Sequence, residues 1–245
     1  MKSIINLAIL LMMTSNALAQ NGLLQKQLKF ARVKQAYNEK WPDLKRDLKK
    51  ENYGDVYELY IAAYKSEGKV ELWLKNQGNE SYKLFKTYNF CEHSGTLGPK
   101  LREGDGQTPE GFYQINVFNP ESSFHLSLGI NYPNQVDLAR TGKVNRPGGD
   151  IYIHGNCVTV GCIPLTDDKI KEVYLLALVA KNGGQQHIPV HIFPFRMTAT
   201  NLKKYGEKFP DQIAFWQILQ KAEQSFEQNK TLPHIIQSKG QYEIR

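Results

Sequence analysis

A histidine and a cysteine eight positions apart are the residues of this sequence best suited to covalent chemistry. His154 is followed by Gly155, and Cys162 is preceded by Gly161, in the stretch IYIHGNCVTVGCIPLT at residues 151–166. An imidazole can take the proton of a thiol, and the resulting thiolate can attack a carbonyl carbon. A glycine before the nucleophile lets backbone N–H groups face that carbonyl, because no Cβ blocks the approach. The stretch therefore predicts an acyl-transfer site with Cys162 as nucleophile and His154 as base.

A strand and a loop must bring the two side chains together. The alternating residues 150–153 predict a strand that ends at His154. Glycine near both ends of the following loop allows the chain to double back, so that the sulfur of Cys162 can reach the imidazole. We expect the two side chains to line one pocket that a peptide can enter.

Other interpretations of the same residues stay open. The histidine and the cysteine can be unrelated buried residues, or His154, Cys157 and Cys162 can bind a metal, although zinc sites usually need a second pair of ligands. A disulfide between Cys157 and Cys162 would block the nucleophile. Alternatively, Cys157 is a small buried residue that only contributes to packing. Three cysteines, with Cys91 the third, leave at least one thiol unpaired in an exported protein.

The first residues are typical of a secretory signal peptide. Lys2 precedes a mostly apolar run at residues 4–13, which is shorter than the about 20 residues that a membrane-spanning helix needs. Ala17-Leu18-Ala19 resembles a cleavage site, so we expect a mature chain of roughly 226 residues from Gln20 onward. No cysteine follows this site, and no later apolar run is long enough to span a bilayer, so we expect no stable membrane insertion.

The rest of the sequence predicts a β-rich core with helices at both ends. Helices are expected at residues 22–50, with a break at Trp41-Pro42, and at residues 166–180 and 200–228, the last split at Phe209-Pro210. Strands are expected at residues 59–64, 70–75, 82–90, 112–118, 124–130 and 188–195, the first three as an antiparallel meander. We expect only turns at residues 132–149 and an irregular tail from Lys230. The predicted divisions are a signal peptide (1–19), an N-terminal helical segment (20–55), a catalytic domain (56–197) and a C-terminal helical extension (198–245).

The formal charge of +7 suits an exported protein that meets anionic surfaces such as cell-wall polymers. There is no nucleic-acid-binding motif and no dense block of lysine and arginine, so no nucleic-acid partner is expected.

Two segments resemble the L,D-transpeptidase catalytic-domain family of bacterial cell-wall enzymes. The stretch IHGNCVTVGCIPL resembles its catalytic motif, and GDGQTPEGFYQI, at residues 104–115, resembles its Thr-Pro-x-Gly strand start. The resemblance covers roughly residues 57–196. It implies an α+β fold with a β-rich sandwich or barrel core and flanking N- and C-terminal helices.

The resemblance also implies roles for residues of the motif. Cys162 matches the nucleophile, His154 and Gly155 match the His-Gly pair that holds the base, and the backbone at Gly161 and Cys162 matches the oxyanion hole. Thr159 matches the Ser or Thr three residues before the cysteine. The sequence departs from the family at Val160, where most members have a second histidine, at Pro164, where an arginine is common, and in its shorter loop. These departures leave the nucleophile and base intact and put the handling of the acyl acceptor in question.

The implied substrate is peptidoglycan, whose stem peptides carry free carboxylates. Arginine forms bidentate pairs with carboxylates, so Arg140 and Arg146 are candidate substrate-binding residues, together with Thr159, Tyr132 and Asn156. No cofactor is expected.

The implied activity is transpeptidation through a Cys162 acyl-enzyme, in the periplasm. The alternative is cleavage by an amidase or L,D-carboxypeptidase, because the C-terminal part, through IFPFRM and AFWQIL, is similar to a branch with an amidase that releases a lipoprotein from peptidoglycan. A peptidoglycan-linked lipoprotein is therefore a candidate partner. A non-catalytic wall-binding module is the alternative from another class, and the presence of both His154 and Cys162 argues against it.

Overall fold

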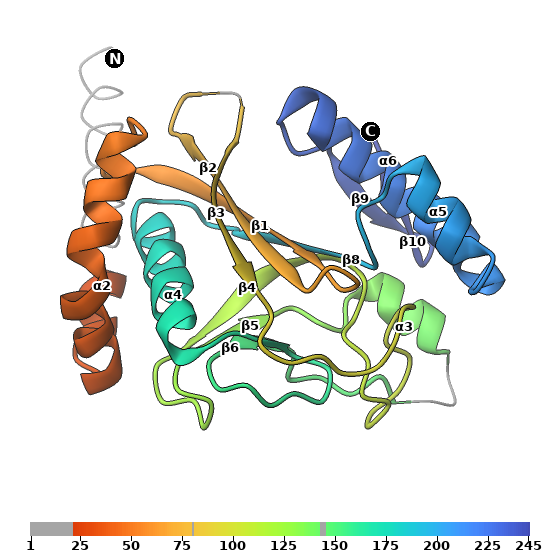
Figure 1. Cartoon of the computed structure of the whole chain (residues 1–245), viewed down its shortest axis with the longest axis horizontal. Helices are drawn as coiled ribbons and strands as arrows, with labels where there is room; N and C mark the ends of the chain where they lie inside the picture. The colour runs from red at the N-terminus through yellow and green to blue at the C-terminus, as the bar shows by residue number, and fades with distance from the viewer. Residues whose placement is uncertain (1–21, 80, 143–145) are drawn as a thin grey trace, which may run out of the picture.

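The computed structural model describes residues 22–79, 81–142 and 146–245. The signal peptide expected at residues 1–19 lies outside these residues. Within the described ranges, no helix is both long and apolar enough to cross a bilayer. The chain forms a mixed α+β molecule in which helices flank one large sheet (Figure 1), which confirms the expected fold class.

Eight strands form the sheet in the order β3-β2-β1-β8-β4-β5-β6-β7. Their bounds are β1 (Tyr57–Tyr64), β2 (Lys69–Asn76), β3 (Lys83–Asn89), β4 (Gly111–Asn119), β5 (Ser127–Ile130), β6 (Tyr152–His154), β7 (Ile163–Pro164) and β8 (Pro189–Phe193). The predicted meander is confirmed as β1-β2-β3. Strand β8 lies between β1 and β4 and is parallel to β1. Its first residue is Pro189, a position where a strand tolerates proline.

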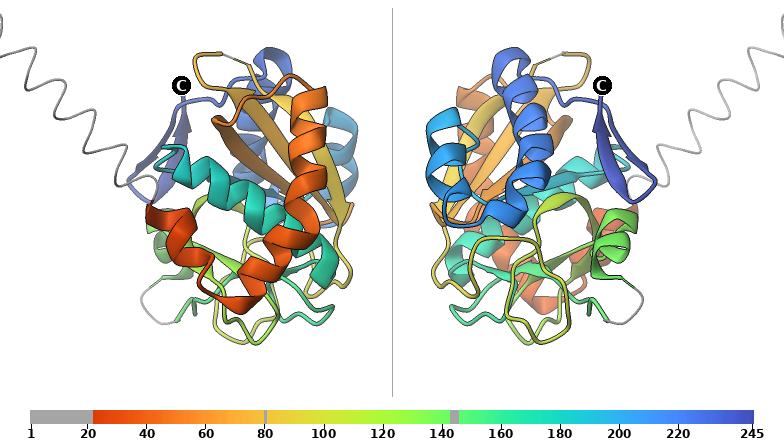
Figure 2. Two further views of the ribbon diagram at one scale, coloured as in Figure 1. Left: turned by 90° about the vertical axis from the view of Figure 1, so that its left-hand side faces the viewer. Right: turned by 90° about the vertical axis from the view of Figure 1, so that its right-hand side faces the viewer.

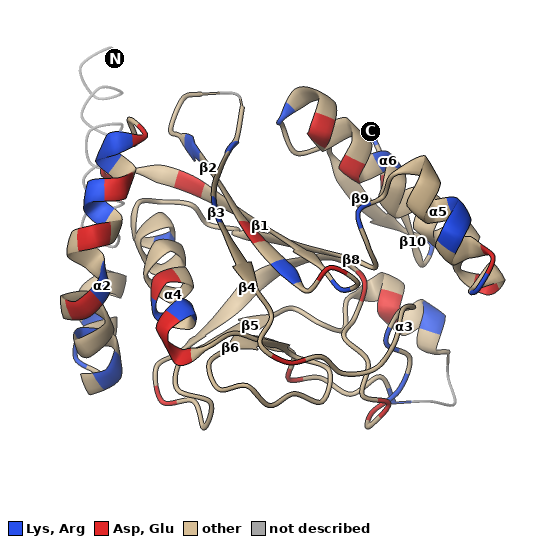
Figure 3. Ribbon diagram, in the orientation of Figure 1, with Lys and Arg blue, Asp and Glu red and all other residues tan. Residues whose placement is uncertain are grey.

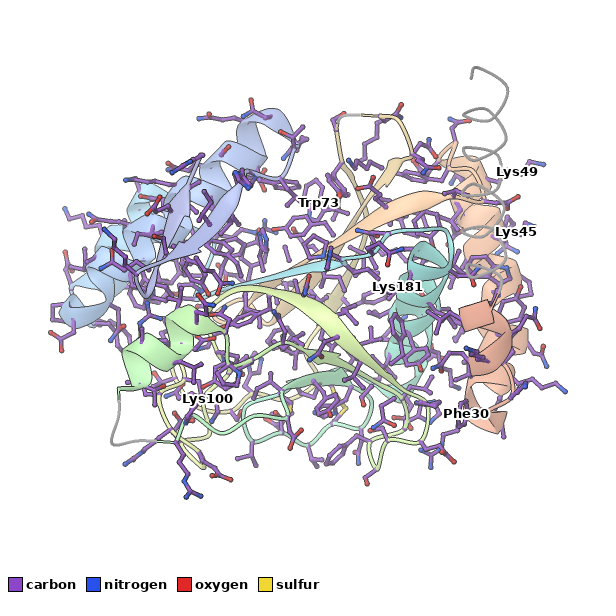
Figure 4. The ribbon with its side chains drawn as sticks, turned by 180° about the vertical axis from the view of Figure 1, so that it is seen from behind. Phe30, Lys45, Lys49, Trp73, Lys100 and Lys181 are labelled. Carbon is purple, nitrogen blue, oxygen red and sulfur yellow. A yellow bond between two sulfur atoms is a disulfide. The ribbon has the colours of Figure 1, made fainter. Side chains whose placement is uncertain are left out.

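The central strands separate two apolar cores, because successive side chains of a strand point to opposite faces. In β1, Leu59, Ile61 and Ala63 belong to one core, whereas Tyr60, Ala62 and Tyr64 belong to the other. Trp73 of β2 packs edge-on against Phe226 at 5.0 Å in the second core. Figure 4 labels this Trp73 between the sheet and the C-terminal helices. Burial on both faces explains why β1 has almost no polar residues.

Helices α2 (Ala31–Lys50) and α4 (Asp167–Asn182) cover the face of the first core (Figure 2). The break predicted at Trp41-Pro42 is wrong, because α2 continues through Pro42. An interior proline costs a helix about 3 kcal/mol. The buried residues Val33, Ala36, Leu44 and Leu48 lie on both sides of Pro42, and their packing holds the two halves in one helix. The chain turns instead at residues 28–30.

The second core is covered by the C-terminal residues. They form α5 (Ala199–Gly206), a 3₁₀ turn η1 (Pro210–Gln212) and α6 (Ile213–Asn229), with the predicted split. The irregular tail predicted from Lys230 is wrong, because β9 (Ile235–Ser238) and β10 (Gln241–Ile244) form a hairpin. Its turn has φ of 49° at Lys239 and 75° at Gly240. Lys-Gly is not one of the usual two-residue turn sequences of a hairpin, so the sequence did not predict this hairpin.

One helix was missed between residues 132 and 149, where only turns were expected. Helix α3 (Gln135–Thr141) begins at Asn134, whose side chain accepts hydrogen bonds from the N–H groups of Val136 and Asp137. The carboxylate of Asp137 accepts the N–H of Asn134 in return, at 2.9 Å. This reciprocal cap was the readable signal, because both residue types are strong N-terminal helix residues.

Acidic and basic residues are interspersed along α2 and α4 (Figure 3). Lys171 of α4 pairs with Glu39 of α2 at 2.7 Å, and Lys40 of α2 pairs with Asp168 of α4. These pairs join the two helices at their polar edges, outside the apolar contact.

Candidate active site

The two reactive residues lie on neighbouring strands at the end of the sheet. Strands β6 and β7 are parallel, and Ile153 pairs with Ile163 and His154 with Pro164. The loop between them therefore doubles back as predicted. Because paired residues share a face and every second residue returns to it, Cys162 and His154 project from the same side. Both line one pocket of about 230 Å³, together with Asp150, Tyr152 and residues of the loop before β5.

His154 is held in a defined tautomer. Its side chain is buried, and Nδ1 lies 2.5 Å from the carbonyl oxygen of Gly155. A carbonyl only accepts, so Nδ1 carries the proton and Nε2 is left as the acceptor. The ring of Phe124 covers the imidazole at 4.8 Å. Burial lowers the pKa of His154, and the hydrogen bond to Gly155 opposes this in part. The resting imidazole is therefore a neutral base.

Cys162 is the free cysteine among the described residues and is partly accessible. Its sulfur accepts the N–H of Tyr152 at 3.4 Å, and the S–H faces the carbonyl of Asp150 at 3.6 Å. Burial raises the pKa of the Cys162 thiol; the N–H of Tyr152 lowers it, the charge of Asp150 raises it and Lys100 lowers it. Burial thus disfavours the charged form of both groups, the thiolate of Cys162 and the imidazolium of His154.

Glycine is required before Cys162 for a steric reason that the sequence did not show. Gly161 has φ of +106°, and a Cβ there would lie 2.7 Å from the carbonyl oxygen of Gln107. The chain at Gln107 thus packs directly under the nucleophile. The N–H of Gly161, expected to face the reacting carbonyl, donates to the Ser94 hydroxyl at 2.7 Å. At Gly155, a Cβ would lie 2.7 Å from an oxygen of Asp167.

A disulfide fixes the loop that leads to Cys162. Cys157 is bonded to Cys91, 66 residues earlier in the chain. The alternatives of a Cys157–Cys162 disulfide and of a small buried Cys157 are therefore wrong, because Cys157 lies exposed in the loop and its partner follows β3. A Cys157 in a disulfide is also not a metal ligand, and the described residues place no group of three or more His, Cys, Asp or Glu side chains around a common point.

The other predicted residues make contacts within the loops and do not line the pocket of His154 and Cys162. Thr159 donates its hydroxyl proton to the carbonyl of Cys162 at 2.9 Å. Asn156 has φ of +65°, and its N–H donates to Asp167 at 2.8 Å. Tyr132 is buried and donates to the carbonyl of Pro147 at 3.2 Å.

The two predicted arginines are not gathered around the nucleophile either. Arg140 lies over the ring of Phe215 at 3.5 Å and lines a separate pocket beside α6. Arg146 is exposed, and its carbonyl accepts the N–H of Glu103 at 2.7 Å. Neither side chain lines a pocket that contains Cys162. The signals for them were their ability to pair with carboxylates and their position shortly before β6, and neither signal gives the direction of a side chain.

A second pocket, of about 410 Å³, opens at Cys162 and was not predicted. Its lining includes Lys65 at the end of β1, the loop after β3 and three C-terminal residues, Tyr205, Lys208 and Phe209.

A buried ion pair supports this second pocket. The ammonium of Lys65 lies 2.9 Å from the carboxylate of Glu110, and both side chains are nearly inaccessible. The same ammonium donates to the carbonyls of Gly98 and Thr108. Trp216 donates its indole N–H to the other oxygen of Glu110 at 2.8 Å. Lys65 and Glu110 are 45 residues apart, so no sequence signal could have paired them.

Lys100 forms a further buried pair near the site. Its ammonium lies 2.7 Å from Asp105 and also donates to the carbonyl of Arg102. Figure 4 labels Lys100 in the loop region below α3. Asp105 in turn accepts the N–H groups of Leu101 and Gln107, so the pair fixes the chain that packs under Gly161.

Comparison with solved structures gives limited similarity. The helical cell shape determining protein Pgp2 from Campylobacter jejuni is 18% identical, with a TM-score of 0.44, over 74% of this chain and 73% of that chain. L,D-transpeptidase 1 from Mycobacterium tuberculosis is 15% identical, with a TM-score of 0.32, over 56% of this chain and 62% of that chain.

Comparison with family models and curated sequences is more specific. The model of the L,D-transpeptidase catalytic domain (YkuD) matches residues 58–192. The Escherichia coli K12 protein named "Putative L,D-transpeptidase YafK" is 35% identical over 188 residues, which cover 76% of this chain and 73% of that protein. A family match over more than half of the chain and a relative this similar lead to one conclusion: this chain belongs to the L,D-transpeptidase catalytic-domain family.

Proposed function

We propose that the protein is a peptidoglycan-modifying cysteine acyltransferase, with Cys162 as nucleophile and His154 as general base. The observation that carries the proposal is the parallel pairing of β6 with β7, which puts the thiol and the imidazole on one face of one pocket. The neutral state of both groups suits this chemistry, since the unprotonated Nε2 can take the thiol proton as the sulfur attacks.

The reaction divides into two halves with one proton shuttled by His154. The sulfur adds to the carbonyl carbon of a stem-peptide amide, and the imidazolium returns its proton to the departing amine, leaving a thioester on Cys162. An acceptor amine or water then adds to the thioester, gives its proton to His154 and releases the thiol. Backbone N–H groups at Gly161 and Cys162 are the donors for each oxyanion, worth about 3–4 kcal/mol apiece in comparable sites. The substrate must therefore take over the hydrogen bond that Gly161 makes to Ser94 at rest.

The two pockets at the sulfur favour transfer over hydrolysis. Cys162 is the lining residue shared by the pocket of about 410 Å³ and that of about 230 Å³. An acyl donor and an acyl acceptor can therefore approach the same atom from separate sites. Hydrolysis by the same thioester, as an amidase or L,D-carboxypeptidase that trims stem peptides or frees a linked lipoprotein, is the alternative outcome.

Digestion of purified peptidoglycan tests this assignment. Wild-type and Cys162→Ala proteins are incubated with the same sacculi, and the products are analysed by mass spectrometry. New crosslinks show transfer, whereas shortened stems or lost protein remnants show hydrolysis. Cys162→Ala should give neither while unfolding like the wild type, and wild-type turnover by this variant would rule out the proposed nucleophile.

Covalent labelling separates the enzyme from a wall-binding module. A carbapenem acylates an activated active-site thiol, so we expect one adduct on Cys162 in the wild type and none in Cys162→Ala. A His154→Gln protein should fold and label far more slowly. Equal labelling of wild type and His154→Gln would remove His154 from the role of base.

We place this activity outside the inner membrane, in the periplasm. The expected signal peptide supports this location. The Cys91–Cys157 disulfide supports it as well, because disulfides persist in oxidising compartments.

A further inference from the structure

The larger pocket at the nucleophile has walls of two different origins. Lys65, Ser94 and Thr108 belong to the segment that matches the family model, which ends at residue 192. Tyr205 and Phe209, with Lys208 near them, come from α5 and the turn after it, beyond that segment. The C-terminal residues thus form one side of the space in which a substrate meets Cys162.

This C-terminal wall is anchored in the core. The ring of Tyr205 stacks on buried Phe195 at 4.5 Å, and its hydroxyl is 2.8 Å from that of Ser66 at the end of β1. Phe209 packs edge-on against Trp216 at 5.9 Å. Trp216 is fully buried and bonded to Glu110, so the wall is fixed to the same polar network that supports the opposite side.

Lys208 is the free positive charge of this pocket. The other lysine in the lining, Lys65, is neutralised by Glu110 and surrounded by carbonyls. Lys208 is exposed, and within the described part of the chain no carboxylate lies within ion-pair distance of it. An ammonium without a partner beside an apolar wall of Tyr205 and Phe209 can bind a carboxylate through charge-assisted hydrogen bonds.

We propose that Lys208 binds a free carboxylate of the peptide whose carbonyl Cys162 attacks, so that the C-terminal segment selects acidic substrates. The inference rests on the proposed function, because it needs an acyl donor in this pocket. A pocket of about 410 Å³ limits the distance, so the carboxylate belongs to the residue at the scissile amide or to its neighbour. The ligand class is a short peptide with an unamidated carboxylate beside the bond that is cleaved.

Two synthetic stem peptides test this selection. They have the same sequence, and in one the carboxylate beside the scissile amide is replaced by a carboxamide. The wild type should prefer the acid by about tenfold in kcat/KM, as expected for one charge-assisted contact at a partly exposed site. Lys208→Met should lose this preference through a higher KM for the acid with kcat nearly unchanged, Lys208→Glu should reverse it, and Lys208→Arg should retain it.

Matched controls separate failure of the inference from failure of the proposed function. Lys203 is an exposed lysine of α5 that does not line the pocket, so Lys203→Met should keep the wild-type preference. The inference is wrong if the wild type does not prefer the acid peptide, or if Lys208→Met has the same preference as the wild type. The proposed function still holds in that case, provided that Cys162→Ala is inactive. If Cys162→Ala turns over both peptides like the wild type, the proposed function itself is wrong. Because Lys208 is exposed, we expect its substitution to leave the fold unchanged. Equal thermal unfolding temperatures of the variants and the wild type check this.

Discussion

At the scale of single residues, the state of the nucleophile follows from burial more than from its neighbours. His154 is buried and Cys162 partly buried, and this burial raises the pKa of the thiol and lowers the pKa of the imidazole. The pair thus differs from a pre-formed thiolate–imidazolium pair. In the proposed mechanism the thiol is therefore activated only during attack, when its proton moves to Nε2.

Alkylation with iodoacetamide measures this resting state. Only the thiolate reacts, so the rate at Cys162 should rise with pH through a midpoint above the ordinary thiol value of 9.0. Cys91 and Cys157 are joined and do not compete. A midpoint near neutral pH would instead show a stable thiolate, contrary to the geometry described above.

Gly161 is the residue at which the smallest change should do the most damage. A methyl group at Gly161 meets the carbonyl of Gln107 at 2.7 Å, and the φ of +106° is unfavourable for any other residue. We expect Gly161→Ala to move Cys162 and reduce labelling by a carbapenem at least tenfold, with a loss of about 1–3 kcal/mol in urea unfolding. Gly149 has open space around its Cβ position, so Gly149→Ala is the matched control. Wild-type labelling of Gly161→Ala would show that the close approach to Gln107 is not needed.

The placement of His154 and Cys162 in one pocket was readable from the sequence, and the surroundings of that pocket were not. His154 and Cys162 lie in one short motif, so their spacing and flanking glycines carried the information. Lys65 with Glu110, and Cys91 with Cys157, are contacts across 45 and 66 residues that only the folded sheet creates. Arg140 and Arg146 lie outside the two pockets at Cys162, because nearness in sequence does not give the direction of a side chain.

At the scale of elements, the catalytic loop is held at both ends by strand pairing and in its middle by the disulfide. Leu165 donates its N–H to the carbonyl of His154 at 2.8 Å, which extends the pairing of β6 with β7. Cys91 donates its N–H to the carbonyl of Pro164 at 3.1 Å, so the segment after β3 is fastened to β7 as well. The loop therefore has little freedom to carry the thiol away from the imidazole.

Removing the disulfide tests how much of this order depends on it. A bridge over 66 residues restricts the unfolded chain by about 4 kcal/mol in the loop-entropy treatment. We expect Cys91→Ser/Cys157→Ser to lose a large part of that free energy of unfolding in urea, and to bind a carbapenem more slowly. Reductant should reproduce the effect in the wild type and leave the double variant unchanged. If the double variant unfolds at the wild-type urea concentration, the bridge has no structural role.

The elements themselves were predictable where the pattern was local. The meander β1-β2-β3 and helix α4 follow alternation and periodicity within one segment, and both were expected. Helix α3 and the hairpin β9-β10 are short, so few residues carry each pattern. Continuation of α2 through Pro42 needed knowledge of the core on both sides of it.

At the scale of the whole molecule, the central strand β8 buries an ionisable residue beside aromatic rings of the second core. His191 of β8 is buried, with Tyr60 and Phe112 each packed edge-on at 4.8 Å. Burial lowers the pKa of His191 to about 3. At pH values between the ordinary pKa of 6.5 and about 3, His191 is protonated in the unfolded chain but not in the folded chain. The folded state therefore loses stability as the pH falls through this range.

Buried carboxyl groups act in the opposite direction and must be separated from this effect. Burial raises the pKa of Glu223 to about 7 and that of Asp137 to about 6. The folded state binds these protons more tightly, so both groups make the protein less stable as the pH rises from about 4 to 7. The measured curve is the sum of the two trends, and its slope alone does not identify His191.

A substitution isolates the contribution of His191 by difference. His191→Phe keeps an aromatic ring between Tyr60 and Phe112 and removes the titrating group. The free energy of unfolding of the wild type relative to this variant should fall by up to about 1.4 kcal/mol for each pH unit from 6.5 downward, and be constant above 6.5. Urea unfolding at half-unit steps between pH 4 and 8 measures the difference, with His187→Gln as a control at an exposed position of the same segment. Parallel curves for wild type and His191→Phe would mean that His191 is protonated as easily inside the fold as in the unfolded chain, which requires water to reach the second core around His191.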